Sequence, residues 1–135
     1  MKFVFEPTRS VLPFYLEKAI EPYLSMYAHE FTAGMDDESW DEYEFFDTSI
    51  QVYIDKKSRK IQAIRCDKNC YWSGRNLINL SIDEFFQHID LENEIYKVEK
   101  MALTDEEEQD VYDFDLLGLQ LWVNDQGVIV CVFVS

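Results

Sequence analysis

YDFDLLGLQLWVNDQGVIVCVFVS, residues 112 to 135, carries the clearest strand pattern in the chain. The apolar residues Leu119, Leu121 and Val123 alternate with Gln120, Trp122 and Asn124. This is the period-two pattern of a strand with one buried face. Residues 124–127 (NDQG) then supply the residue types that tight turns prefer. The apolar run at 128–134 (VIVCVFV) predicts a second strand that is buried on both faces. The stretch therefore predicts a hairpin at the centre of a sheet.

A similar stretch lies earlier in the chain, at residues 43–66 (YEFFDTSIQVYIDKKSRKIQAIRC). Both stretches follow an acidic run, and both contain a strand, a turn and a second strand. Two explanations stay open: an internal duplication with half-repeats 1–68 and 69–135, or two ordinary half-buried hairpins. Aligned without gaps, the stretches match at Tyr43 with Tyr112, Phe45 with Phe114, Gln51 with Gln120, Tyr53 with Trp122 and Ile54 with Val123.

Two helices are expected outside these hairpins. The first begins at Ala19 and ends at Gly34, with an apolar stripe at Ile20, Tyr23, Leu24, Tyr27 and Phe31. The second follows Ser81, because Ser81 and Glu84 have the spacing of a capping box. Residues 2–5, 10–16 and 71–72 are expected to be extended, whereas 90–103 has both helical and strand spacing.

One domain, residues 1–135, is expected from the length. The elements predict an α+β fold with an antiparallel sheet and two helices, made of tandem strand-helix-strand-strand halves if the duplication holds. The expected core consists of Leu119, Leu121, Val123, Ile129 and Phe133 together with Ile50, Val52, Ile20 and Phe85.

Charge is the most unusual property of the composition. The chain carries 27 acidic and 12 basic residues, for a formal net charge of −15. Such a surface repels nucleic acid and anionic membranes and attracts a basic partner. No signal-peptide core or membrane-spanning apolar run is present, and three cysteines, an odd number, suit a reducing compartment. A cytoplasmic location is therefore expected.

No catalytic, metal or cofactor site is predicted. Cys66 and Cys70 have no histidine near them in the sequence, so a zinc site is not indicated. No serine, threonine or cysteine lies in a nucleophile motif, and the glycines are isolated turn residues. Acidic residues are so numerous that a catalytic carboxylate pair could be drawn almost anywhere, and solvated acidic loops explain them better.

The predicted surface contains candidate partner-binding residues. Acidic runs at 36–47 and 105–115 precede the two hairpins, and Tyr53 and Trp122 fall on the outer faces of the strands. Aromatic side chains framed by charge are typical of binding hot spots, although a helix layer or a dimer mate could equally cover them. The candidate partner-binding residues are Asp36, Asp37, Glu38, Trp40, Asp41, Glu42, Tyr43, Glu44, Tyr53, Asp105, Glu106, Glu107, Glu108, Asp110 and Trp122.

Three segments together resemble a known class of proteins: SVLPFYL…IEPYL, NLINLSIDEFF and LGLQLWVNDQGVIVCVFV. In size, charge and pattern the chain resembles the small acidic proteins encoded beside bacterial polymorphic toxins, including the immunity proteins of contact-dependent growth inhibition systems. The resemblance implies a non-enzymatic cytoplasmic inhibitor that binds a cognate toxin C-terminal domain, often a basic nuclease, and masks its active site. The alternative is an acidic adaptor or oligomeric structural protein, and a homo-oligomer stays open in either case.

Overall fold

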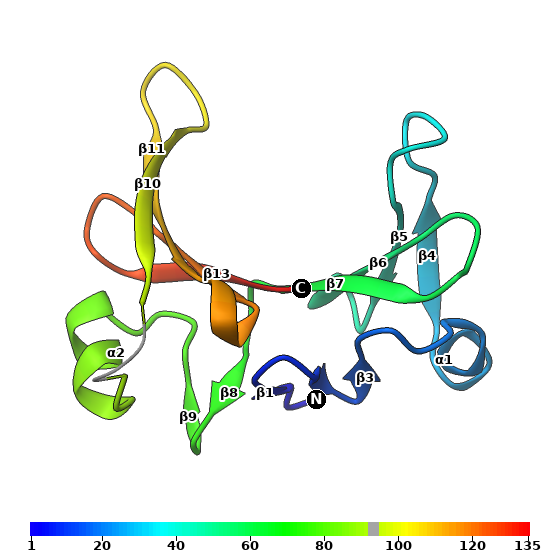
Figure 1. Cartoon of the computed structure of the whole chain (residues 1–135), viewed down its shortest axis with the longest axis horizontal. Coiled ribbons are helices and arrows are strands. Elements are labelled where there is room, and N and C mark those ends of the chain that lie inside the picture. The colour runs from blue at the N-terminus through cyan, green and yellow to red at the C-terminus, as the bar shows by residue number, and fades with distance from the viewer. Residues whose placement is uncertain (92–94) are drawn as a thin grey trace.

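An eight-stranded antiparallel sheet dominates the structure, a computed structural model that describes residues 1–91 and 95–135. Its strand order is β10-β11-β12-β13-β7-β6-β5-β4, so each half is a four-stranded meander and the two meet where β13 pairs with β7 (Figure 1). The strands are β4 (His29–Thr32), β5 (Asp41–Phe45), β6 (Ile50–Ile54), β7 (Ile61–Cys66), β10 (Lys97–Ala102), β11 (Glu108–Phe114), β12 (Leu119–Val123) and β13 (Ile129–Val134).

The two meanders repeat the same hydrogen-bonding register. Tyr43 pairs with Val52 in one half, and Tyr112 pairs with Leu121 in the other. Each half has one register shift in its last hairpin, after Tyr53 in the first and after Trp122 in the second. Both hairpins therefore bend at the same place, and the sheet is close to symmetric about its central strand pair. A common origin of the halves stays a prediction.

A second layer covers one face of this sheet. It contains a small five-stranded sheet in which β1 and β8 are parallel, together with the two short helices, and Figure 1 shows these elements below the large sheet. Its members are β1 (Val4–Glu6), β2 (Ser10–Leu12), β3 (Phe14–Tyr15), β8 (Tyr71–Trp72), β9 (Arg75–Asn76), α1 (Glu21–Met26) and α2 (Ile82–His88), and a 3-10 turn, η1 (Asp115–Leu117), precedes β12.

The hydrophobic core fills the space between the layers. It takes the inward side chains of the large sheet and the apolar side chains of the second layer, including Phe3, Phe5 and Phe14. The expected core residues are confirmed as buried with one exception: Leu119, Leu121, Val123, Ile129, Ile50, Val52, Ile20 and Phe85 are each at most 1% exposed. The α+β class, with an antiparallel sheet and two helices, is likewise confirmed.

The second helix begins where the capping box predicts. Ser81 is the N-cap of α2, and its Oγ accepts a hydrogen bond of 3.1 Å from the backbone N–H of Glu84. Phe85 points into the core from this helix and is fully buried. Tyr71 and Trp72 form β8, as expected. Residues 10–16 form two short strands, but not one extended segment, because β2 and β3 pair antiparallel and the chain turns at Pro13.

The first helix is shorter than predicted. It ends at Met26, because Tyr27 takes an extended conformation and residues 29–32 instead form the edge strand β4. Phe31 therefore does not join the helical stripe; its ring lies 4.9 Å from that of Tyr43 across the β4–β5 pair and is half exposed. Long-range strand pairing has overridden the local helical spacing.

Phe133 is the exception among the expected core residues. The apolar run predicts burial on both faces, but only one face of β13 is covered by the second layer. Val132 and Val134 point into the core, whereas Phe133 and Val130 lie on the opposite face and are partly exposed. Within 90–103, where the spacing was ambiguous, residues 97–102 form β10, and 92–94 lie outside the described residues.

Candidate functional site

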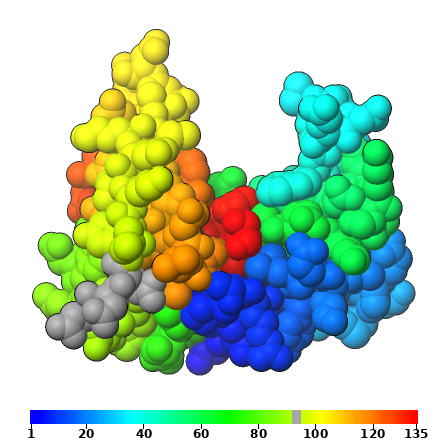
Figure 2. Space-filling view, viewed as in Figure 1, coloured from blue at the N-terminus to red at the C-terminus, as the bar shows by residue number. Residues whose placement is uncertain are grey.

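The face of the large sheet that the second layer leaves open is concave. The β4–β5 and β10–β11 hairpins rise as two arms on either side of it (Figure 1), and Figure 2 shows a hollow between them with the C-terminal strand at its base. At the base lies a groove with a volume of about 510 Å³. We call it the central groove; its lining residues are Tyr53, Arg65, Asp67, Leu103, Gln109, Trp122, Val130, Cys131 and Phe133.

Aromatic side chains form much of the floor of the central groove. Tyr53 and Phe133 come from different halves of the sheet, and their ring centroids are 5.9 Å apart. Trp40 extends this row, with its ring 6.1 Å from that of Tyr53. Trp122 lies on β12 at the position that Tyr53 has on β6, since both immediately precede the register shift of their hairpin. The two aromatic residues predicted on the outer faces thus line one groove.

A polar network crosses this floor. The Tyr53 hydroxyl interacts with the Glu42 carboxylate on one side and the Arg65 guanidinium on the other. Burial, followed by the negative charge of Glu42, raises the pKa of Tyr53 to about 12. Burial also raises the pKa of the Cys131 thiol, although the nearby Arg65 opposes the rise. Tyr53 and Cys131 are therefore both neutral neighbours of Arg65 at pH 7.

Arg65 is an exposed cation in the central groove of an acidic protein. Among residues 1–91 and 95–135, the ion pairs are Lys56–Asp41, Arg59–Glu21 and Arg75–Glu84, and none of them involves Arg65. Asp67 also lines the groove, and its Oδ1 is buried without a hydrogen-bond partner. The groove thus holds a guanidinium that no carboxylate of the described chain neutralises by direct contact.

Acidic residues lie at the ends of both arms. Asp36, Asp37 and Glu38 lie in the β4–β5 connection, and 105–107 (Asp105, Glu106, Glu107) lie in the β10–β11 connection, at the ends of the arms in Figure 1. We call these residues the arm tips.

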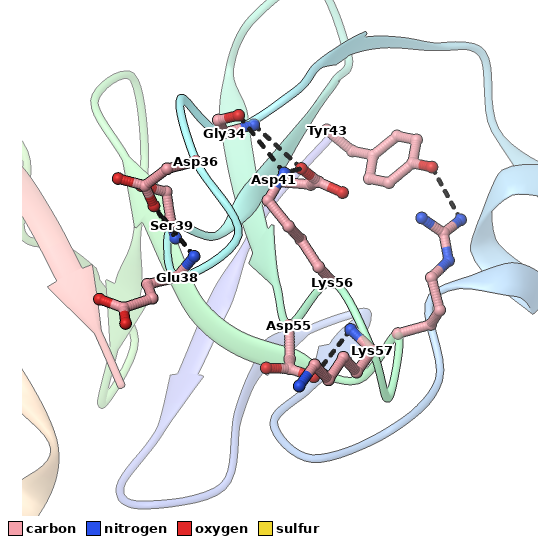
Figure 3. A network of polar contacts seen from close by, with 10 residues as sticks. Gly34, Asp36, Glu38, Ser39, Asp41, Tyr43, Asp55, Lys56 and Lys57 are labelled. Carbon is pink, nitrogen blue, oxygen red and sulfur yellow. Dashed lines mark hydrogen bonds and ion pairs between the residues drawn. The ribbon is translucent and has the colours of Figure 1, made fainter.

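The arm tips are held by local hydrogen bonds. Asp36 Oδ1 accepts hydrogen bonds from the backbone N–H groups of Glu38 and Ser39 and from the Ser39 hydroxyl (Figure 3), and the Ser39 hydroxyl is the main cause of the lowered pKa of Asp36. In the other arm, Thr104 Oγ1 accepts from the backbone N–H groups of Glu106 and Glu107. The arm tips thus occupy corresponding places on the two sides of the groove.

Asp41 and Tyr43 are held inside the structure. Asp41 is 7% exposed, and its Oδ1 accepts hydrogen bonds from Lys56 Nζ at 2.6 Å and from the Gly34 backbone N–H at 2.9 Å (Figure 3). The Lys56 contact is the main cause of the lowered pKa of Asp41. Tyr43 is 6% exposed, and its hydroxyl accepts a hydrogen bond from Arg59. These two candidates stabilise the base of an arm and offer little surface to a partner.

The remaining candidates divide between the two faces of the sheet. Glu42 and Glu44 pair across strands with Tyr53 and Gln51, which places them on the concave face. Asp110 pairs across strands with the inward residue Val123, so Asp110 and Glu108 lie on the other face of the sheet, where they line a second hollow with Lys100 and Tyr112. The structure therefore places the arm tips on opposite sides of the central groove, and Trp40, Glu42, Tyr53 and Trp122 in it or beside it. Glu44 lines a separate hollow with Tyr27 and His29, and Glu108 and Asp110 lie apart from the groove as well.

Sequence reasoning missed Arg65, Cys131 and Phe133 as groove residues. The sequence does contain a signal for these residues. In the alignment of the two similar stretches, the strands at 61–66 and 129–134 are equivalent, since each is the last strand of its hairpin. In the sheet these strands pair antiparallel, with Arg65 opposite Phe133. If the last strands of the two hairpins had been paired with each other in the prediction, Phe133 would have faced the same side of the sheet as Arg65, away from the core.

Within residues 1–91 and 95–135, no cluster of histidine, cysteine and carboxylate side chains has the arrangement needed to hold a metal ion. No helix among them has the length and apolarity to cross a membrane. Comparison of the chain with protein-family models, with curated proteins and with solved structures finds no match.

Proposed function

We propose that this chain is an immunity protein that binds the basic surface of a cognate toxin domain in the central groove and between the two arms, and so masks the toxin's active site. The observation that carries the proposal is the placement of two acidic arm tips on opposite sides of an aromatic groove. The resemblance in size, charge and sequence pattern to immunity proteins supports it independently of the geometry.

Charge favours a basic occupant. The chain has a net charge of −15, and the arm tips concentrate acidic side chains where a partner would first approach. Such a distribution speeds association with a positively charged surface and disfavours nucleic acid. Toxin domains that cleave nucleic acid need a basic surface to hold the phosphate backbone, and that surface would be complementary to the arms. A nuclease is therefore the toxin class we propose, met in the cytoplasm.

Affinity needs more than charge, because exposed ion pairs contribute only about 0 to 1 kcal/mol each. The groove floor supplies partly exposed aromatic rings at Tyr53, Trp122 and Phe133. Rigid aromatic side chains at the centre of a surface, surrounded by polar groups, are the usual hot spots of protein interfaces. The arms would set the association rate and the floor would hold the complex.

The test is to express the candidate toxin domain of a neighbouring gene in cells that lack this chain, and in cells that produce it. We expect growth only when the chain is present, with a complex of the two purified proteins in solution. Equal growth in both strains would contradict the proposal. A chain carrying Asp37→Asn, Glu38→Gln, Asp105→Asn and Glu106→Gln should protect less well than the wild type.

An oligomeric structural protein is the second candidate, and one observation favours it. Both outer strands of the large sheet have an unpaired edge among the described residues, and every residue of β4 and β10 is exposed. Strand edges of this kind can pair with another copy. Sedimentation with and without the toxin domain separates the candidates: the immunity proposal expects a complex with the toxin domain whatever the state of the free chain, and an oligomer that does not bind the toxin domain would favour the structural role.

A further inference from the structure

We infer that the central groove recognises a side-chain carboxylate in the middle of the partner's basic surface, and that Arg65 binds it. The inference rests on the proposed function and adds the chemistry of the contact. It predicts that the occupant is a patch of lysine and arginine with an aspartate or glutamate at its centre, rather than a uniformly basic surface.

The first argument is the position of the charge. Arg65 lies on β7, one of the two central strands, and its exposed side chain lines the groove between the acidic arms. A uniformly basic partner would press its own cations against this guanidinium as water leaves the interface. An unpaired charge that loses its water is strongly unfavourable, so a bound partner must supply a counter-charge at this point.

The second argument is that the described chain does not supply the counter-charge. The groups that interact with the guanidinium are the Cys131 thiol and the Tyr53 hydroxyl. Tyr53 has a pKa of about 12, and burial raises the pKa of Cys131, so neither is an anion at pH 7. Asp67 lines the same groove but forms no ion pair with Arg65 within residues 1–91 and 95–135.

The third argument is geometry. A guanidinium has five N–H donors in a planar fork, and two neutral neighbours leave donors available. A carboxylate accepts two parallel hydrogen bonds from such a fork, which a hydroxyl or an amide cannot match. Phe133 faces Arg65 across the strand pair, and its ring would help to exclude water from the contact.

The experiment uses two short peptides with blocked ends, each of alternating lysine and arginine, one with a central glutamate and one with a central glutamine. Binding is followed by NMR shifts of the groove residues of the isotope-labelled full chain. The glutamate peptide has the lower positive charge, so general attraction to the acidic protein favours the glutamine peptide. We expect the reverse, with the glutamate peptide about two- to tenfold tighter, because of the contact with Arg65.

Substitutions assign the preference to Arg65. Arg65→Gln should abolish or reverse it, Arg65→Lys should retain part of it, and the matched control Arg9→Gln, an exposed arginine outside the groove, should leave it unchanged. Equal binding of the two peptides to the wild type, tighter binding of the glutamine peptide, or a preference that survives Arg65→Gln would overturn the inference while the proposed function stands. If neither peptide shifts the groove resonances, the basic occupant of the proposed function is itself contradicted.

Discussion

Arg65 and Phe133 lie opposite each other where β7 pairs with β13, and this pair marks the middle of the eight-stranded sheet. The neighbouring pairs are Cys66 with Val132 and Ile64 with Val134, whose side chains point into the core. The same strand pair thus joins the halves of the fold on one face and forms the groove floor on the other. Stability and the proposed binding should therefore be separable by residue: we expect inward positions to control folding and outward ones to control recognition.

Leu121→Ala tests the inward face. Leu121 is fully buried on β12, so the substitution removes buried methyl groups and leaves a cavity. We expect a loss of about 2 to 5 kcal/mol in the free energy of unfolding. Leu116→Ala is the matched control, because Leu116 is 71% exposed and its loss should cost less than about 0.5 kcal/mol. Urea unfolding measures both, and a similar small change in the two variants would show that the strand faces are wrongly assigned.

Asp41 should make stability depend on pH. Its pKa in the folded chain is lowered, chiefly by Lys56, whereas the unfolded chain has the ordinary value near 3.8. Between the two values the unfolded state binds a proton that the folded state does not, so stability increases with pH. The contribution of Asp41 is complete above the ordinary value and is lost as the pH falls through the lowered one.

The corresponding measurement is the unfolding free energy of wild type, Asp41→Asn, Lys56→Gln and the double variant from neutral to acidic pH. The coupling between the two sites should favour the wild type at neutral pH and vanish in acid. A coupling that is zero at neutral pH, or that grows as the pH falls, would show that the ion pair does not hold the base of the arm.

Part of this fold could be predicted because its hairpins and second helix carry local signals. The alternation at 119–123 and the capping box at Ser81 are properties of neighbouring residues. Strand β5 was not predicted, and the segment that forms β10 was left open between helix and strand, for different reasons. In β5 the inward residue Asp41 is charged, which breaks the apolar pattern, and its burial depends on the ion pair with Lys56. In β10 every residue is exposed, so the strand has no buried face. Such strands are specified by their partners across the sheet.

The candidate surface was predictable only in outline. Acidic runs and outward aromatic residues are visible in the sequence, and the arm tips, Tyr53 and Trp122 do lie around one groove. Which acidic residues face the groove depends on the strand register, which turned Glu108 and Asp110 away and placed Asp41 inside. The role of Arg65 depends on the pairing of β7 with β13, which joins segments far apart in the chain.

The cysteines should be slow to react in the folded protein. Cys66, Cys70 and Cys131 are all buried, and the pKa of Cys66 is raised by its contact with Cys70 and by burial. Thiol reagents attack the thiolate, so both accessibility and ionisation oppose reaction. A chromogenic disulfide reagent at pH 8 should react far more slowly with native protein than with protein unfolded in urea. Complete reaction of even one thiol within mixing time would show that its surroundings are open.

The arm tips should govern the rate of association. Neutralising Asp37, Glu38, Asp105 and Glu106 together should lower the association rate with the toxin domain and flatten its dependence on salt, because steering charge is removed. The matched control neutralises four exposed acids away from the arms: Glu17, Asp83, Asp115 and Asp125. Stopped-flow kinetics at several salt concentrations compare the variants. If both sets change the association rate equally, the rate depends on the net charge of the chain and not on the position of the acidic residues at the arm tips.

Binding of the toxin domain in the central groove is tested by calorimetry, which measures the dissociation constant of the purified complex for wild type, Trp122→Ala and Leu116→Ala. Trp122 lies in the groove, and Leu116 is an exposed apolar residue outside it. Thermal unfolding first establishes that each variant is folded. We predict that Trp122→Ala weakens the complex by about 30-fold or more, as expected for a hot spot, and that Leu116→Ala leaves it unchanged. Wild-type affinity in a folded Trp122→Ala variant would contradict binding in the central groove.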